Sequence, residues 1–322
     1  MKLRWGILGA GRILAKFAAA FPLTRDAELV ALASRDPERA RQFKAPRIHI
    51  GYEALLADPE VDVVANTLHN GLHCEWTIRA LEAGKHVLCE KPLACSVAEV
   101  DRMFAAARAN GRWLLEGFMY RFHPQIAEAY RRVQDGEVGR VLHIRAHYAT
   151  RGREADNPRY SREAGGGALL DVGCYGVNFV RLFAGAEPVR VSAHGHFADV
   201  DLTLAAQLDF PNDVTGHVLC SFESEGSYSA EVIGTAGKLL IPNPWLPPAG
   251  QGELIVTRAG KSESIPVTTP EWLTPFAAEI DHLSDCIRQN RAPQFPPGLD
   301  AETDSRGNMC ALEMIDVAAR HP

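Results

Sequence analysis

The tripeptide Glu90-Lys91-Pro92 places a cation between a carboxylate and a proline, directly after the apolar run His86-Val87-Leu88. The residue before a proline is disfavoured in helical conformations, so we expect Lys91 to lie at the end of a β-strand rather than inside a helix. Open α/β sheets bind ligands at the carboxyl ends of their strands. A lysine at such a strand end is therefore a candidate for contact with a ligand.

A second candidate group follows a long connection without obvious secondary structure, about residues 150–167, which ends in Gly165-Gly166-Gly167. Connections of this length in compact domains usually bind ligands, close over them or are disordered. We expect a helix to start near Leu169 and to place Asp171 and Tyr175, four residues apart, on one face. Tyr175 could serve as a proton donor or as a core aromatic residue, and its local sequence favours the core.

The elements that must position Lys91 begin at the N-terminus. Leu3–Leu8 reads as a short apolar strand, followed by Gly9, Gly11 and a helical run over 12–21. Two glycines in such a turn allow the backbone to approach a pyrophosphate at the start of the helix. The third glycine of the dinucleotide-binding pattern is Leu14 here, so an ordinary tight turn between strand and helix remains an alternative.

The end of the second strand, expected over 28–33, is where dinucleotide-binding folds recognise the adenosine ribose. This chain has Ser34 and Arg35 there, with Arg39 one helical turn later. Guanidinium groups pair with phosphates, so these residues favour NADP over NAD. NAD remains possible, because Asp36 could contact a ribose or cap the next helix. The two arginines could also form a solvated helix face.

The loop after the strand that ends at Thr67 carries two histidines four residues apart, His69 and His73. Zinc proteases with this spacing have Glu directly after the first histidine, whereas this chain has Asn70, and we predict no metal site. The loop leaves the carboxyl edge of the predicted sheet and is expected to line the cofactor site. The residues predicted to do so are Thr67, Leu68, His69, Asn70 and His73.

The order of strands and helices predicts two domains. Up to residue 117 they alternate, which is typical of a parallel Rossmann sheet covered by helices on both faces. Later strands are joined by short turns, which favours an α+β domain with a large, mostly antiparallel sheet. The predicted domains are 1–120, which binds NAD(P), and 121–322, which binds substrate. The strands expected in the second domain are 141–149, 189–197, 202–210, 214–222, 227–233, 238–241 and 254–256, with closing helices near 274–289 and 301–319.

Composition excludes several classes of protein. The chain has 322 residues and a net charge of −6, which argues against nonspecific binding to nucleic acid. No run of about 18 apolar residues occurs, so we predict no membrane-spanning helix. The strand-like N-terminus suggests no signal peptide, and we expect a cytoplasmic protein. The seven cysteines form no CxxC pair and are expected to be free thiols.

Three segments carry a resemblance to a known family: Gly9-Ala10-Gly11-Arg12-Ile13, the stretch 80–92 that contains Glu90-Lys91-Pro92, and the stretch 166–175 that ends at Tyr175. Together they resemble the glucose–fructose oxidoreductase, inositol dehydrogenase and rhizopine-catabolism family (Gfo/Idh/MocA) of NAD(P)-dependent oxidoreductases, over nearly the whole chain. Many members carry His where this chain has Tyr175. With tyrosine at this position, the chain resembles the branch of the family that contains dihydrodiol dehydrogenases and NADP-dependent xylose (aldose) dehydrogenases.

The resemblance implies that Lys91 and Tyr175 meet in a cleft between the domains and act on one substrate hydroxyl. Tyrosine is a poor base at neutral pH, since its pKa is about 10, and a nearby cation lowers that pKa. The implied roles are acid and base for Tyr175, assistance for Lys91, and for Asp171 the orientation of Lys91 or a contact with a substrate hydroxyl. The residues expected to bind the cofactor are Gly9, Gly11, Arg12, Ile13, Ser34, Arg35, Arg39, Glu90 and Lys91, with the 67–73 loop.

The predicted substrate is a sugar, such as a pentose or hexose, or a related cyclic polyol. Oxidation of a trans-dihydrodiol or reduction of a keto-sugar by the same mechanism is an alternative, as is a non-catalytic regulator that senses NAD(P). A homodimer through the C-terminal sheet is also expected. The residues expected to contact substrate are Arg121, His123, Asn157, Arg159, Asp171 and Tyr175.

Overall fold

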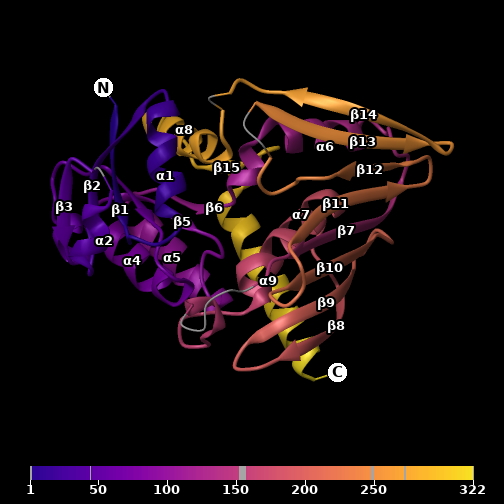
Figure 1. The fold of residues 1–322 in the computed structure, drawn as a ribbon, viewed down its shortest axis with the longest axis horizontal. Coiled ribbons are helices and arrows are strands. Elements are labelled where there is room, and N and C mark those ends of the chain that lie inside the picture. The colour runs from indigo at the N-terminus through magenta and orange to yellow at the C-terminus, as the bar shows by residue number, and fades with distance from the viewer. Residues whose placement is uncertain (1, 44, 152–156, 248–249, 272, 322) are drawn as a thin grey trace. The chain divides into compact units, whose positions relative to one another are not determined.

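The computed structural model describes residues 2–43, 45–151, 157–247, 250–271 and 273–321. The chain forms two compact units (Figure 1): the first contains Met1–Phe122 and Trp272–Arg306, and the second contains His123–Glu271 and Gly307–Pro322. The sequence predicted one boundary, after residue 120, whereas the segment 272–306 packs with the N-terminal unit. Residues 152–156 of the predicted long connection lie outside the described residues.

The first unit contains a six-stranded parallel sheet in the order β3-β2-β1-β4-β5-β6, which confirms the predicted Rossmann sheet. From β1 the chain moves outward to β3 and then returns to the other side of β1 with β4. This reversal creates the switch point at which open α/β sheets bind ligands. The strands are β1 (Leu3–Leu8), β2 (Ala27–Ser34), β3 (Arg47–Ile50), β4 (Val63–Asn66), β5 (His86–Glu90) and β6 (Leu114–Gly117).

Most strands of this sheet are apolar and largely buried, whereas β3 (Arg47–Ile50) is partly exposed. Every residue of β4 and β6 is buried, as is the second half of β1, which is the pattern of a parallel sheet inside an α/β unit. Asp36 accepts hydrogen bonds from the amides of Glu38 and Arg39 and so caps α2. The helices are α1 (Leu14–Ala20), α2 (Pro37–Arg41), α3 (Tyr52–Leu56), α4 (His73–Glu82), α5 (Val97–Ala109) and α8 (Pro275–Arg288), with short 3₁₀ turns η1 (Phe21–Leu23), η2 (Asn70–Leu72) and η3 (Met119–Phe122).

The second unit contains an eight-stranded sheet in the order β14-β13-β12-β11-β7-β10-β9-β8. Only the β7–β10 pair is parallel, so the expected mostly antiparallel sheet is confirmed. The helices of this unit are α6 (Pro124–Gln134) and α7 (Cys174–Ala184), while α9 (Ala301–Arg320) carries residues of both units. The strands are β7 (Val141–Ala149), β8 (Arg190–Phe197), β9 (Asp201–Asp209), β10 (Thr215–Ser221), β11 (Ser227–Gly234), β12 (Lys238–Ile241), β13 (Gln251–Arg258) and β14 (Lys261–Thr268).

Helix α7 forms the centre of the second core, and all of its residues are buried. It packs on β7 and β10, and two glycines allow the close approach. A Cβ on Gly176 would lie 3.0 Å from Val218 Cγ1, and one on Gly216 would lie 2.2 Å from Val180 Cγ1. Although α7 is apolar, no helix among the described residues is long and apolar enough to cross a membrane.

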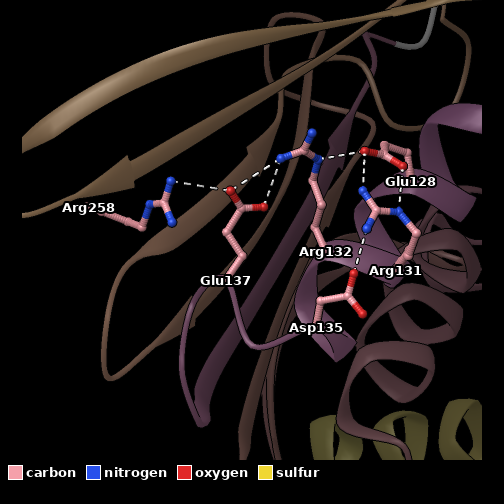
Figure 2. A network of polar contacts seen from close by, with 6 residues as sticks. All are labelled: Glu128, Arg131, Arg132, Asp135, Glu137 and Arg258. Carbon is pink, nitrogen blue, oxygen red and sulfur yellow. Dashed lines mark hydrogen bonds and ion pairs between the residues drawn. The ribbon is translucent and has the colours of Figure 1, made fainter.

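A network of ion pairs lies at the C-terminal end of α6 (Figure 2). Arg132 bonds to Glu128 at 2.7 Å and to Glu137 at 2.9 Å, and Glu137 also pairs with Arg258 of β13 at 3.6 Å. Most of these side chains are partly exposed, and such pairs contribute little individually. Their common effect is to hold the end of α6 against the sheet, while the arginine charges are balanced within the network.

Candidate functional site

The glycine turn at the end of β1 has the geometry of a dinucleotide-binding turn. Gly9 has φ of +101°, a left-handed conformation that favours glycine. A Cβ at Gly9 would lie 3.0 Å from Leu68 Cδ2 and 3.3 Å from the carbonyl oxygen of Thr67. Gly11 is exposed, and only the Thr67 carbonyl oxygen lies as near as 4.0 Å to its Cβ position. The backbone at Gly11 is thus open to a pyrophosphate, and the residues fit such a group.

Helix α1 begins at Leu14, two residues later than expected. Leu14 occupies the third glycine position and is fully buried, so this position serves the core of the unit. Arg12 is exposed and Ile13 is half-buried between the turn and the helix. Both precede the helix and lie beside the turn that is open to the cofactor.

The end of β2 presents two cations to solvent, and its exposed acid caps the next helix. Ser34 is buried, and its hydroxyl accepts a hydrogen bond from the amide of Asp36 at 3.0 Å. The Asp36 carboxylate caps α2 and pairs with Arg39 at 3.5 Å. The Arg35 guanidinium lies over the ring of Tyr52, 5.7 Å from its centroid. The side chains of Arg35, Asp36 and Arg39 are all exposed, so this strand end offers solvent two guanidinium groups beside the carboxylate that caps α2.

Lys91 lies directly after β5, as the sequence predicted, in a turn whose backbone is held on several sides. The amide of Lys91 donates to Glu90 Oε2 at 3.2 Å, and the amide of Leu93 donates to Glu116 Oε1 at 2.8 Å. The Lys91–Pro92 peptide bond is cis. Glu116 is 2% exposed, so one buried carboxylate from the neighbouring strand fixes the far side of the turn.

His73 does not present its ring to the surface. It is 0% exposed, and burial lowers its pKa to about 4. Its Nδ1 lies 2.8 Å from the carbonyl oxygen of Pro92, and its Nε2 lies 2.9 Å from that of Leu68. The expectation that His73 contacts the cofactor therefore does not fit its position. Among the described residues, no group of three or more His, Cys, Asp or Glu side chains could hold a metal ion.

Glu279 of α8 was not singled out from the sequence. It is fully buried, and neither carboxylate oxygen has a hydrogen-bond partner among the residues that the structure describes. Burial, followed by the charge of Glu90, raises its pKa well above the usual value. An ionised carboxylate in such a place would be unstable, so Glu279 is held as the neutral acid. A glutamate in an otherwise regular amphipathic helix gives no local sign of this burial.

Arg121 and His123 differ from their predicted role. The side chain of Arg121 is 0% exposed, bonds the carbonyl oxygen of Pro296 at 2.7 Å and pairs with Asp304 at 3.3 Å. His123 is 1% exposed and caps α6, where its Nδ1 accepts from the amide of Gln125 at 3.2 Å. Both side chains are committed to internal contacts, so the structure gives them a structural role instead of an open face for substrate.

The second unit places Asp171 and Tyr175 on consecutive helical segments. Asp171 lies in a π-helical turn, η5 (Leu169–Gly173), and Tyr175 lies at the start of α7. Short π segments are frequent at functional sites. Arg159 Nε lies 2.9 Å from Asp171 Oδ2, and Asn157 accepts a hydrogen bond from the amide of Arg159. The structure thus brings together Asn157, Arg159 and Asp171.

Two glycines of the triplet are required by close contacts around this turn. A Cβ at Gly166 would lie 2.4 Å from the carbonyl oxygen of Arg159, and one at Gly167 would lie 2.2 Å from Asp201 Oδ1. Asp201 accepts from the amide of Leu169 at 2.6 Å, and burial raises its pKa to about 6. Asp201, at the start of β9, thus holds the start of η5. The periodicity of the sequence does not show this contact, because the two residues lie 32 positions apart.

The ring of Tyr175 is fixed by other aromatic rings. It is 6% exposed, and its centroid lies 5.7 Å from that of Tyr148 and 5.5 Å from that of Trp245. Aromatic contacts of this kind restrict a side chain to one orientation. Sequence reasoning missed Trp245, because nothing in its surrounding proline-rich stretch links it to α7.

Comparison with known proteins identifies the family. A family model described as an oxidoreductase family with an NAD-binding Rossmann fold matches residues 3–118, and one described as a GFO/IDH/MocA C-terminal domain matches residues 126–240. The chain belongs to the Gfo/Idh/MocA family. It is therefore an NAD(P)-dependent oxidoreductase, as its sequence predicted.

Similar members of the Gfo/Idh/MocA family include both curated and solved proteins. An uncharacterized oxidoreductase, ORF334 of Rhizobium meliloti, is 36% identical over 98% of this chain and 97% of its own length. The trans-1,2-dihydrobenzene-1,2-diol dehydrogenase of Mus musculus is 35% identical over 90% and 89%. Among solved structures, the 3-ketoreductase KijD10 of Actinomadura kijaniata, in complex with NADP and TDP-benzene, has a TM-score of 0.90 and 29% identity over 99% and 98%. The aldose-aldose oxidoreductase of Caulobacter crescentus has a TM-score of 0.89 and 30% identity over 99% and 98%.

Replacement of Glu279 by Gln should raise stability at alkaline pH. A carboxyl whose pKa is raised by folding contributes its stability below its unfolded pKa of about 4.3 and loses it as pH rises toward the folded value. We expect Glu279→Gln to increase Tm by about 2 °C or more at pH 8, with the gain shrinking toward pH 4. Exposed Glu263 provides the control, Glu263→Gln. A lower Tm for Glu279→Gln at pH 8 would contradict the account.

Proposed function

We propose that this oxidoreductase transfers a hydride between NADP and a CH–OH group of a sugar or related cyclic polyol, with Tyr175 as acid and base and Lys91 as the assisting cation. The observation that carries the proposal is the position of Lys91. It follows β5 at the carboxyl edge of the parallel sheet, in a turn held by Glu116. A cation fixed at this edge is suited to act on a substrate oxygen beside a bound nicotinamide.

The protein must manage one proton while the nicotinamide supplies or accepts the hydride. In oxidation, Tyr175 accepts the proton of the substrate hydroxyl, and in reduction it donates a proton to the carbonyl oxygen. A cation beside the phenol would favour the phenolate over the neutral form, and Lys91 is the proposed cation. Tyr148 and Trp245 hold the phenol ring in one direction, which reduces the freedom lost in the transition state.

A polyhydroxylated substrate suits the polar groups next to Tyr175. Asp171 and Arg159 form an ion pair at 2.9 Å, and both can also bond hydroxyl groups, because a carboxylate accepts and a guanidinium donates. Asn157 begins the same 3₁₀ turn as Arg159. Sugar hydroxyls would find donors and acceptors on two segments that the Arg159–Asp171 ion pair joins.

A trans-dihydrodiol is the second candidate substrate. The observation that favours it is the 35% identity to the mouse dihydrodiol dehydrogenase over 90% of this chain. Such a diol offers two neighbouring hydroxyls, and the same proton and hydride apparatus would oxidise it. Turnover with a panel of aldoses, keto-sugars and cyclic diols decides between the two classes.

A second copy of the chain is the proposed partner of the sheet in the second unit. One face of β10 packs on α7 through Gly216 and Val218, while His217 and Leu219 on the other face are exposed. Leu219, a large apolar side chain at the centre of an open sheet, is 43% exposed.

We also propose a cytoplasmic location, supported by the seven cysteines that form no disulfide. Cell fractionation would test this location.

Removal of either proposed reacting group should abolish most turnover. We expect Lys91→Met and Tyr175→Phe each to lower kcat by about 10² or more, because each removes a part of the proton transfer. Binding of NADPH, measured by fluorescence titration, should change little in Tyr175→Phe. Full activity in either variant would exclude the proposed mechanism, and an inactive wild type that still binds NADPH would favour a regulator.

The proposed NADP preference rests on Arg35 and Arg39. We expect the double variant Arg35→Ala/Arg39→Ala to raise KM for NADP about tenfold or more and to leave KM for NAD nearly unchanged, since only NADP carries the 2′-phosphate. Arg41→Ala on the same helix is the matched control, because Arg41 is exposed and pairs with Glu38. Equal effects on both cofactors would refute this assignment.

The proposed dimer can be tested at Leu219. Light scattering after size-exclusion chromatography should give a dimer for the wild type and a monomer for Leu219→Glu, because a buried unpaired charge opposes association. Val189→Glu, at another exposed apolar position, should remain dimeric. A monomeric wild type would disprove the proposal.

A further inference from the structure

His73 connects two backbone segments that border the proposed site. Its ring lies between the carbonyl oxygens of Pro92 and Leu68, at 2.8 and 2.9 Å. Its own backbone is fixed by Asn66, whose Nδ2 donates to the carbonyl oxygen of His73 at 3.1 Å and to Thr77 at 3.1 Å. The imidazole is therefore held at a set place rather than free to follow either segment.

The two segments have different partners. Leu68 packs on the glycine turn, where its Cδ2 approaches the Cβ position of Gly9 at 3.0 Å. Pro92 is the residue after Lys91, and its carbonyl group belongs to the turn that carries the lysine. A single side chain thus links the pyrophosphate-binding turn to the lysine-bearing turn.

The ring can donate to only one of these carbonyl groups at neutral pH. Both partners are acceptors, and a neutral imidazole carries one N–H. Burial lowers the pKa of His73 to about 4, so the ring is neutral at pH 7. The contact with Pro92 is buried, whereas that with Leu68 is partly buried. A buried carbonyl without a donor costs more than one that can reach water, so the proton belongs on Nδ1.

We propose that His73 is a positioning residue for Lys91, which holds the lysine-bearing turn by an Nδ1–H hydrogen bond to the Pro92 carbonyl group. This inference rests on the role proposed above for Lys91. Glu90 and Glu116 accept hydrogen bonds from amides of the turn, and the Cys89 thiol donates to the carbonyl group of Leu93 at 3.8 Å. His73 contacts the carbonyl group of Pro92, the residue next to the lysine, so loss of this hydrogen bond should allow the turn and the ammonium group to move.

The choice of nitrogen permits a matched pair of variants. Asn places its amide nitrogen near the position of Nδ1, and Gln places its amide nitrogen near that of Nε2. We expect His73→Asn to keep kcat within about threefold of wild type and His73→Gln to lower kcat about tenfold or more, with KM for NADP changed less than kcat. Rates are normalised to the fraction that binds NADPH, so a loss of folded protein does not imitate the effect.

If His73 acts through Lys91, the effects of substitutions at His73 and Lys91 on kcat should not be additive. His73→Gln should have little further effect on kcat in a Lys91→Met background. If Lys91→Met alone leaves kcat unchanged, the proposed function fails; if it lowers kcat and His73→Gln does not, only the present inference fails. Equal kcat values for His73→Asn and His73→Gln would overturn the inference. So would a decrease in kcat on His73→Gln that is as large in the Lys91→Met background as in the wild type.

The tautomer can be read directly in the wild-type protein, whether or not the variants fold. Long-range ¹H–¹⁵N correlation spectra, assigned by the loss of one imidazole in either variant or by selective histidine labelling, should show His73 protonated on Nδ1 and neutral at pH 7. A proton on Nε2 would overturn the inference.

Discussion

The hydrogen bonds that hold the turn after β5 are the interaction on which the rest of the site depends. A parallel sheet ends its central strands at one edge, and the side chain that follows each strand is directed by the turn that begins there. The turn after Glu90 is held by the Glu116 carboxylate on the amide of Leu93 and by His73 on the carbonyl group of Pro92. A long lysine side chain loses much rotational freedom when it is fixed at a reacting atom. A rigid turn ensures that the backbone of the lysine adds no further conformational freedom to that of its side chain.

The second unit also attaches its proposed reacting side chain to fixed backbone, but it does so mainly by packing. Tyr175 lies on a helix that is buried along its whole length, and aromatic rings hold its side chain. Asp201 fixes the start of the preceding π-helical turn through the amide of Leu169. The groups that would bind substrate, Asp171 and Arg159, are thereby attached to rigid backbone at one end of a packed core. In both units, buried polar side chains such as Glu116 and Asp201 orient chain segments through hydrogen bonds to backbone amides.

The parts of the fold that the sequence predicted are those with strong local patterns. The Rossmann sheet follows from apolar strands separated by amphipathic helices, and the placement of Lys91 follows from the proline after it. β14 was missed because it is an edge strand with most residues exposed, and β3 because its four residues alternate half-buried and exposed. The return of residues 272–306 to the first unit was also missed. An amphipathic helix shows that it packs, but not on what, so the burial of Glu279 and the inward bonds of Arg121 depended on long-range contacts.

In the proposed mechanism, Lys91 and Tyr175 act on one substrate oxygen. A double-mutant cycle on kcat with Lys91→Met, Tyr175→Phe and the double variant tests it most directly, because residues that act as a unit are strongly non-additive. We expect the double variant to be about as impaired as the more damaged single variant, with all three proteins still binding NADPH. Losses that simply multiply would contradict a shared role for the two side chains.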